Sequence, residues 1–410
     1  MSTKPTSWHI YIHIQLTTFL AHSHSLMINM ALQRQIITPL LVIFMILHSY
    51  ALHEPSNWEY EPSRGSVRAA YWPSGSDFSP SSIDTKYFTH IYYAFIEPDP
   101  LFFNLNVTEF HKKWIPNFIN GLRYRHPPVK TLLSIGGGGS NSTAFSLMAS
   151  TKQNRQVFIK STIHVAREYG FNGLDLDWEF PETELDMSNL GLLFQEWHQA
   201  LVVEAQIQRK PRLLLTSAVY YASTIKLIGN GPRSYPAQAI TKYLDWASPM
   251  CFDYHGTWAN FTGFNAALYD PNSNISTRYG IGLWIESGVP PEKLVMGLPL
   301  YGRAWKLQDP NVHGVGAEAV GEATDTDGTM DYDEILVFNK DNGANVVYDE
   351  VAVSFYSYAD TTWIGYDDGP SITKKVRFAK SKGLKGYFFW AIGKDKDWTI
   401  SRQASNTWGH

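Results

Sequence analysis

Three acidic side chains alternate with apolar ones near the middle of the chain. Asp175, Asp177 and Glu179 lie two positions apart within residues 171–181, and alternate residues of a β-strand point to the same side. The three carboxyl groups are therefore expected to share one face, roughly 6.6 Å apart along the strand axis. Because neighbouring negative charges raise one another's pKa, such a row suits proton-transfer chemistry. A half-buried strand with a solvated acidic side has the same pattern, so the rest of the chain must distinguish the two.

Eight strand-like runs, most of them separated by helix-like segments, make up the chain around this row. The predicted strands are 67–72, 90–96, 130–135, the acidic row itself, 212–219, 246–253, 294–300 and 386–391. The predicted helices are 107–124, a stretch ending near 170, 187–207, 236–243, 277–287, 371–382 and 398–408. This alternation predicts an α/β fold, a parallel (β/α)8 TIM barrel, whose active site lies at the carboxyl ends of its strands. Both faces of a barrel strand are apolar, so three buried acids favour a functional role.

The segment between residues 301 and 371 interrupts this regular alternation. It contains strand-like runs such as 344–348 and 352–358, and a connection this long predicts an inserted module. We therefore expect a small α+β insertion between strand 7 and helix 7. The expected organisation is an N-terminal extension and signal peptide over 1–51, a linker over 52–66, a catalytic barrel over 67–302 and 366–410, and the insertion over 303–365.

The N-terminal region has the pattern of a secretory signal. After Met30 the chain is basic, residues 36–47 are mostly apolar, and small residues follow up to Ala51. The run is too short to be a stable membrane anchor, so the protein is expected to be secreted, to the extracellular space or the vacuole. Residues 1–29 do not fit the pattern and are interpreted as an upstream start or a dispensable extension. Four glycosylation sequons are compatible with secretion: Asn106, Asn141, Asn260 and Asn274.

Composition excludes several classes of protein. The net charge of -4 with scattered Lys and Arg argues against nucleic-acid binding, and the lone Cys251 excludes an intramolecular disulfide. The 14 Trp, 23 Tyr and 22 Phe are suited to stacking on sugar rings as well as to core packing. The glycines at 136–139 lack the Lys-Ser/Thr of a phosphate-binding loop. Neither a cofactor nor a metal is predicted, and a monomer is expected.

From about residue 66 onward, the chain resembles glycoside hydrolase family 18, and within it the plant class V chitinases. The resemblance depends on four motifs in the expected order and on the expected strands. They are Asn172-Gly173-Leu174-Asp175-Leu176-Asp177-Trp178-Glu179, Ser134-Ile135-Gly136-Gly137, Met250-Cys251-Phe252-Asp253, and Trp390 on the last strand.

The resemblance implies a retaining, substrate-assisted hydrolysis of β-1,4 linkages in chitin, chitooligosaccharides or related N-acetylglucosamine polymers. Glu179 would protonate the glycosidic oxygen, while the sugar's own 2-acetamido oxygen attacks the anomeric carbon. Asp177 would hold the acetamido N–H, and Asp175 would share a proton with it, so that the two titrate as one unit. Lipid-bearing chitooligosaccharides are candidate substrates, since no separate chitin-binding module is visible.

The resemblance also implies residues that bind the sugar chain. Trp390 would form the floor of the site, and Asp253 would contact the sugar beside the scissile bond, next to Met250 and Phe252 on the same strand. Packed or merely solvated side chains are the alternative interpretation for the remaining groove candidates. These candidates are Tyr71, Phe95, Trp258, Tyr301 and Arg303. Ser134, Gly136 and Gly137 are expected to support the barrel mouth.

Two positions depart from the family pattern. Phe252 stands where the family has Tyr, whose hydroxyl donates to the acetamido oxygen, and Asn172 stands where it has Asp. Loss of one such donor slows catalysis by about one to three orders of magnitude. An inactive or weak chitinase-like carbohydrate-binding protein is therefore an alternative. A third interpretation, an unrelated barrel hydrolase with two catalytic carboxylates, predicts indifference to N-acetylation.

Overall fold

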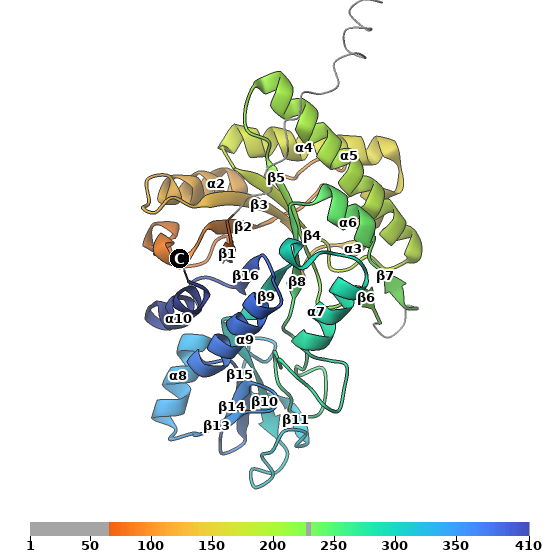
Figure 1. Cartoon of the computed structure of the whole chain (residues 1–410). Helices are drawn as coiled ribbons and strands as arrows, with labels where there is room; N and C mark the ends of the chain where they lie inside the picture. The colour runs from red at the N-terminus through yellow and green to blue at the C-terminus, as the bar shows by residue number, and fades with distance from the viewer. Residues whose placement is uncertain (1–64, 227–230, 410) are drawn as a thin grey trace, which may run out of the picture. The chain divides into compact units, whose positions relative to one another are not determined.

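The structure, a computed structural model, describes residues 65–226 and 231–409 (Figure 1). The predicted signal peptide and nearly all of the predicted linker therefore lie outside the described residues. Within the described part of the chain, no helix is long and apolar enough to cross a membrane.

Eight parallel strands form the barrel that the alternating pattern predicted (Figure 1). They are β1 (Val67–Pro73), β2 (His90–Ile96), β3 (Lys130–Gly136), β4 (Gly173–Asp177), β5 (Leu214–Tyr220), β8 (Trp246–Met250), β9 (Val295–Pro299) and β16 (Gly386–Trp390). Their order is β8-β5-β4-β3-β2-β1-β16-β9. A parallel bridge from Ala247 to Leu294 joins the two edge strands, so the barrel is nearly closed and the predicted fold is confirmed.

The helices cover the outside of the barrel. They are α2 (Glu109–Leu122), α3 (Ser142–Ser150), α4 (Lys152–Tyr169), α5 (Glu184–Gln208), α6 (Ala237–Tyr243), α7 (Thr277–Glu286), α9 (Gly369–Ser381) and α10 (Thr399–Trp408). α5 begins three residues before the predicted start at 187, because Thr183 and Asp186 form a capping box there. The stretch predicted to end near 170 is two helices, since the Thr151 hydroxyl accepts from Asn154 N and starts α4.

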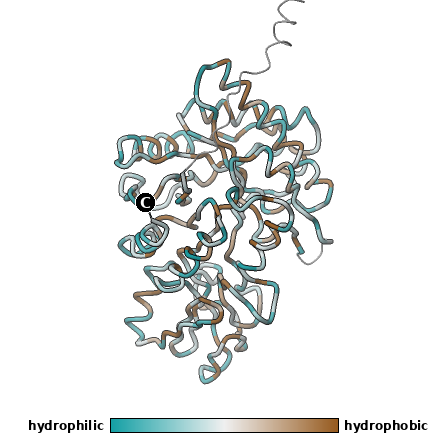
Figure 2. The backbone as a smooth tube through the Cα atoms, viewed as in Figure 1, coloured by the Kyte–Doolittle hydropathy of each residue, from teal (hydrophilic) through white to brown (hydrophobic). Residues whose placement is uncertain are grey.

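Side chains of the strands alternate between two apolar layers; Figure 2 shows hydrophobic residues as brown stretches along the backbone. Leu174 and Leu176 of β4 belong to the large core shared with the helices. The barrel interior is a separate, smaller cluster that includes Tyr71, Trp246 and Phe388. The acids of β4 therefore point inward, toward the axis of the barrel, as the period of two predicts.

The insertion is an antiparallel sheet with one helix, as predicted for the segment after strand 7. Its elements are β10 (Tyr301–Leu307), β11 (Ala319–Glu322), β12 (Thr329–Asp331), α8 (Tyr332–Asp341), β13 (Asn345–Asp349), β14 (Ser354–Ala359) and β15 (Thr362–Tyr366). The runs at 344–348 and 352–358 correspond to β13 and β14. Short elements complete the fold: β6 (Thr224–Ile225) and β7 (Arg233–Ser234), and 3-10 turns at Pro80–Ser82, Thr85–Tyr87, Pro291–Lys293 and Lys396–Trp398.

Candidate active site

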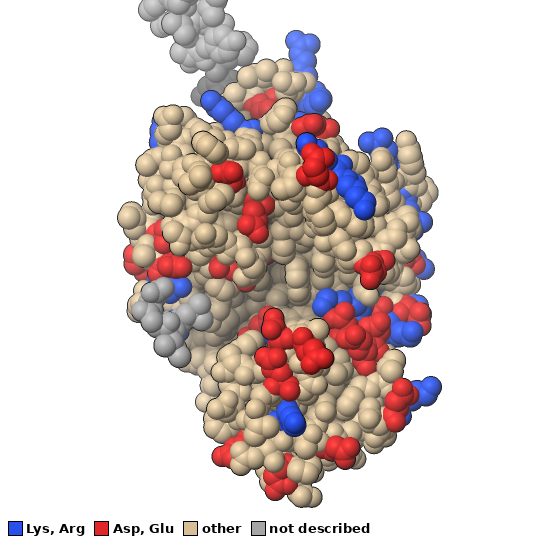
Figure 3. Space-filling view, turned by 180° about the vertical axis from the view of Figure 1, so that it is seen from behind, with Lys and Arg blue, Asp and Glu red and all other residues tan. Residues whose placement is uncertain are grey.

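A cavity of about 850 Å³ lies at the carboxyl ends of the barrel strands, where Arg303 of β10 also contributes to the wall. The surface is hollowed between the barrel and the insertion on the face shown in Figure 3, with acidic side chains gathered on the insertion's side. Ten of the residues predicted from the sequence line this cavity. They are Tyr71, Phe95, Asp177, Glu179, Met250, Phe252, Asp253, Trp258, Arg303 and Trp390.

The acidic row extends past the end of its strand. The sequence pattern placed Glu179 on the same strand as the two aspartates. The structure differs, because β4 ends at Asp177 and Glu179 lies two residues beyond it. Asp177 and Glu179 nevertheless line the same cavity, and Asp175 lies beneath them. The side chains of Asp175 and Asp177 are 0% and 4% exposed, which excludes the alternative of a solvated acidic strand face.

Asp175 is surrounded by hydroxyl donors. Tyr71 OH donates to Oδ2 at 2.9 Å, Ser134 Oγ donates to the same oxygen at 2.7 Å, and Thr216 Oγ1 donates to Oδ1 at 2.5 Å. Burial raises the pKa of Asp175, and these three hydrogen bonds act in the opposite direction. Hydrogen bonds to a carboxylate stabilise its charged form, so the three donors offset part of the effect of burial, although the pKa of Asp175 stays above its usual range.

Asp177 has the contrasting environment. Its Oδ1 is buried and has no hydrogen-bond partner among the described residues. Burial raises the pKa of Asp177 well above its usual range, and the charges of Glu179 and Asp175 raise it further. Where two neighbouring acids share one proton, the proton rests on the acid that lacks donors. The arrangement therefore favours a protonated Asp177 beside an ionised Asp175.

Glu179 lies at the mouth of this group and has an intermediate environment. Burial, followed by the charge of Asp253, raises the pKa of Glu179 to about 7. A carboxyl group with this pKa is protonated in about half of the molecules at neutral pH. The group can therefore donate a proton in its acid form and accept one in its base form.

The glycines of the third strand bring the backbone close to the acids. Gly137 N donates to the carbonyl of Asp177 at 2.8 Å. Gly136 has a φ of 115°, and a Cβ there would lie 2.0 Å from the Asp177 carbonyl oxygen. A Cβ at Gly138 would lie 3.4 Å from Glu179 Oε1. A side chain at Gly136 would therefore push this loop away from the end of β4, whereas a Cβ at Gly138 would make only an ordinary contact with Glu179.

Asp253 is held by two residues of β10. Its Oδ1 accepts from Tyr301 OH at 2.7 Å and from Arg303 Nε at 2.8 Å, and the Arg303 guanidinium lies 4.9 Å from the centre of the Trp258 ring. Trp258 is 63% exposed and is available for stacking. Tyr301 differs from the prediction, since it is buried and does not line the cavity. It positions Asp253 instead.

Aromatic rings form the deep wall of the cavity. Phe95 and Trp390 stack with centroids 5.5 Å apart, and Tyr71 lies 5.6 Å from Trp390. Phe252 packs edge-on against Tyr301 and Phe388. Apolar rings of this kind suit the flat faces of sugar rings and exclude water from the acids.

Sequence reasoning missed several residues of the site. Thr216 is the register partner of Asp175 on β5. The sequence feature that could have indicated it is a hydroxyl residue in the middle of an apolar strand. Of the other missed residues, Ala218 and Phe388 lie inside β5 and β16, and most of the rest lie in loops, where no periodicity indicates which way a side chain points. These other missed residues are Gly138, Phe180, Ala218, Tyr220, Tyr221, Lys226, Tyr254, Ile275 and Phe388.

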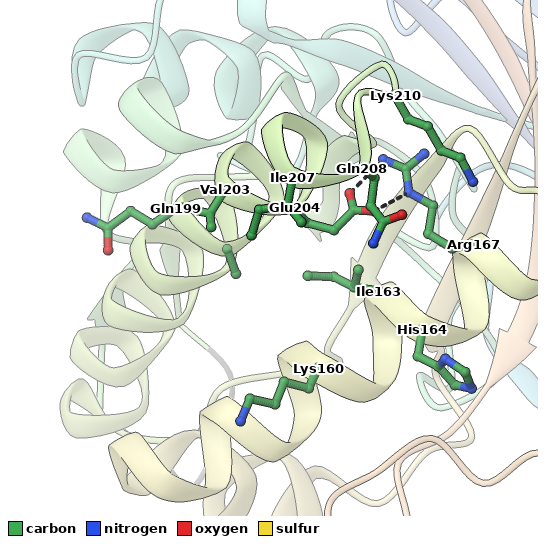
Figure 4. A pocket seen from close by; sticks show the side chains of 11 residues that line it. Lys160, Ile163, His164, Arg167, Gln199, Val203, Glu204, Ile207, Gln208 and Lys210 are labelled. Carbon is green, nitrogen blue, oxygen red and sulfur yellow. Dashed lines mark hydrogen bonds and ion pairs between the residues drawn. The ribbon is translucent and has the colours of Figure 1, made fainter. Parts of the chain in front are cut away.

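A second cavity, of about 640 Å³, lies between α4 and α5 (Figure 4). Its walls are largely aliphatic, from Ile163, Val203 and Ile207. The carboxylate of Glu204 is paired with Arg167 through bonds of 2.9 and 2.7 Å, so it is not free for chemistry. This cavity lies in the outer helix layer and is not the active site. No group of His, Cys, Asp or Glu among residues 65–226 and 231–409 is arranged to hold a metal.

Comparison with known proteins points to the same chemistry. The model of "Glycosyl hydrolases family 18" matches residues 67–395. A class V chitinase, CHIT5 of Lotus japonicus, is 74% identical over 94% of this chain and 98% of its own length. Nod factor hydrolase protein 1 of Medicago truncatula is 48% identical over 83% of this chain and 90% of its own. The crystal structure of a GH18 chitinase from Cycas revoluta in complex with (GlcNAc)3 aligns with a TM-score of 0.79 and 45% identity, covering 84% of this chain and 100% of that one.

Proposed function

The chain belongs to glycosyl hydrolases family 18, and from this premise we propose how its cavity cleaves its substrate. The protein is a chitinase that hydrolyses chitooligosaccharides. The observation that carries the mechanism is the placement of Glu179 and Asp177 in one cavity above the hydroxyl-bonded Asp175. The roles of these residues are our proposal.

Glu179 is the general acid. Its raised pKa leaves it a proton to give to the glycosidic oxygen as the bond to the anomeric carbon breaks, and the leaving sugar departs as an alcohol. The Glu179 carboxylate then accepts a proton from the incoming water. The same group therefore serves both halves of the reaction.

The nucleophile is the 2-acetamido oxygen of the substrate. Asp253 is held by Tyr301 and Arg303, and Asp175 is buried beneath the cavity floor, so neither is placed to attack the sugar. The acetamido oxygen bonds to the anomeric carbon and forms an oxazolinium ion, which water opens with retention of configuration. An N-acetyl group at the cleaved sugar is thus required.

Asp177 and Asp175 stabilise the positive charge that develops on the oxazolinium. The carboxyl group of Asp177, which lines the cavity, accepts the acetamido N–H and aligns the oxygen for attack. The negative charge held on Asp175 by three hydroxyls is shared through the pair as the reaction proceeds.

Hydrolysis of matched substrates tests this mechanism. The purified protein is incubated with N-acetylated and fully deacetylated chitooligosaccharides of equal length, and products are followed by mass spectrometry. We expect cleavage of the acetylated substrate alone, and its loss in Glu179→Gln. Cleavage of both substrates would indicate two catalytic carboxylates, and binding without cleavage would indicate the carbohydrate-binding alternative.

We also propose that lipid-bearing chitooligosaccharides are substrates. Support comes from the 48% identical relative named a Nod factor hydrolase and from the open, aromatic cavity, of which Trp258 forms an exposed edge. Competition between an acylated and an unacylated pentamer, measured as the ratio of kcat/KM, tests this point. No cleavage of the acylated pentamer would contradict the proposal, and a ratio above one would show a preference for the lipid-bearing substrate.

Secretion completes the proposal. The signal-like pattern that follows Met30 supports it, and so does the exposure of all four sequon asparagines. Expression of the full chain in plant cells, with N-terminal sequencing of protein recovered from the medium and from vacuoles, would locate both the protein and its cleavage site.

A further inference from the structure

Three of the four sequons lie beside residues that line the active-site cavity. Asn274 directly precedes the lining residue Ile275, and its carbonyl accepts a hydrogen bond from the hydroxyl of the lining residue Tyr221 at 3.1 Å. Asn260 follows Trp258 by two positions. Consecutive Cα atoms are 3.8 Å apart, so Asn260 lies at most about 7.6 Å from Trp258.

The third sequon lies on the loop between β3 and α3, and β3 is three strands away from β8 in the barrel. Asn141 follows the lining residue Gly138 by three positions, at most about 11.4 Å along the chain. The next residue, Ser142, donates through Oγ to the carbonyl of the lining residue Phe180. This loop is therefore fixed to the segment that follows Glu179.

The local structure at these asparagines is compatible with modification. All three are exposed, and an N-linked glycan attaches at Nδ2. Asn141 caps α3 through Oδ1, which accepts from Ala144 N, and this oxygen stays free in the modified residue. Thr262 and Ser276, the hydroxyl residues of the Asn260 and Asn274 sequons, are buried. Packing therefore gives a second explanation for the presence of these two residues. Thr143, the third residue of the Asn141 sequon, is exposed, so packing does not account for it.

We propose that Asn141, Asn260 and Asn274 carry N-linked glycans that stand at the rim of the cavity and limit which substrates enter it. Two of the sites belong to the segment between β8 and α7, and one belongs to the β3–α3 loop, which is three strands away around the barrel, so the glycans approach the opening from two different strands. A glycan is bulky and hydrated. It admits a short, mobile chitooligosaccharide and hinders a long chain or a chitin surface. This inference rests on the proposed function and on secretion.

Asn106 provides a matched control. It is an exposed sequon as well, but it is eleven positions from Phe95, the lining residue nearest to it in the sequence, and the residue that its N–H bonds, Glu97, does not itself line the cavity. Loss of a glycan at Asn106 is therefore expected to leave substrate access unchanged.

The test uses the full chain secreted from a plant cell line, with site occupancy measured by glycopeptide mass spectrometry. Activity is measured on (GlcNAc)5 and on colloidal chitin for the wild type, for Asn106→Gln, and for the triple variant Asn141→Gln, Asn260→Gln and Asn274→Gln. We expect the triple variant to raise kcat/KM on colloidal chitin by about threefold or more with little change in kcat on the pentamer, since access rather than chemistry changes. Asn106→Gln is expected to match the wild type on both substrates.

Enzymatic removal of the glycans from the folded wild type gives a second measurement that does not depend on the variant folding. It is expected to reproduce the effect of the triple substitution. Unmodified Asn141, Asn260 and Asn274 in the secreted protein would overturn the inference, and so would an unchanged ratio of the two activities after deglycosylation. Failure to cleave the pentamer in any form would overturn the proposed function and the inference with it.

Discussion

Replacement of Thr216 by valine tests whether the hydroxyls around Asp175 decide where the shared proton rests. Thr216 is fully buried and donates to Asp175 Oδ1 at 2.5 Å, and valine has nearly the same shape without the donor. A hydrogen bond to a charged group contributes about 1.5–3 kcal/mol. Since one pKa unit corresponds to about 1.36 kcal/mol, the pKa of Asp175 is expected to rise by about one to two units.

The consequence appears in the pH dependence of the reaction. The Asp175–Asp177 pair must carry one negative charge to balance the oxazolinium, so activity is lost at low pH when both acids are protonated. A weaker acid at Asp175 takes up that second proton at higher pH. The acidic limb of kcat/KM against pH is therefore expected to move up by about one to two units in Thr216→Val, while the basic limb stays in place.

Two control variants separate this effect from general damage to the barrel. Thr216→Ser keeps a hydroxyl and is expected to restore most of the wild-type profile. Ser217→Ala removes a neighbouring buried hydroxyl of β5, whose partners are the carbonyls of Leu176 and Ala218. It is expected to lower stability without moving either limb. A folded Thr216→Val protein with an unchanged acidic limb would refute the reasoning.

Three further predictions follow from the same geometry. Because the pKa of Glu179 is raised to about 7 and the acid must be protonated, kcat/KM should fall as pH rises through about 7. Glu179→Gln should lower kcat by about 10² to 10⁴. A stopped assay across pH 5 to 9 measures the pH dependence of the wild type and the loss in the variant. Activity that increases above pH 7 would contradict the role assigned to Glu179. Phe252→Tyr should raise turnover on chitooligosaccharides by at least about tenfold, since it supplies a donor to the acetamido oxygen, whereas unchanged or lower turnover would show that Phe252 does not face this group. Lys375→Met should destabilise the protein by about 3–5 kcal/mol in urea unfolding, because it leaves the carboxylate of Asp367 buried without its cation; a smaller loss in Lys375→Met paired with Asp367→Leu would confirm that the cost comes from the unpaired charge.

The parts of the site that follow one strand could be predicted from the sequence. A period of two placed Asp175 and Asp177 on the inner face of β4, and the alternation of strands and helices gave the barrel whose open end receives Glu179. These features depend only on local geometry, which the order of residues determines directly.

The remaining parts depend on how separate strands align. The partnership of Thr216 with Asp175 is set by the register of β4 and β5, and sequence periodicity does not report register. Tyr301 was expected to line the groove, but the antiparallel sheet of the insertion turns it toward Asp253. The strands β10, β11, β12 and β15 were not assigned, because alternation in this sheet is broken by glycines such as Gly302, Gly321 and Gly365.

Three identical functional groups perform different tasks in this cavity because the barrel gives each a different environment. Asp175 is dry and fully hydrogen-bonded, so it keeps its charge. Asp177 is buried at the cavity wall and its Oδ1 has no donor among the described residues, so its pKa is raised most and it holds the proton. Glu179 lies past the strand end, where burial and the charge of Asp253 raise its pKa to about 7. Burial and the charges of its two carboxylate neighbours raise the pKa of Asp177 well above its usual range, which suits a group that keeps its proton better than one that donates it. The position of Glu179 at the mouth of the cavity therefore separates the proton donor from the pair that stabilises the intermediate.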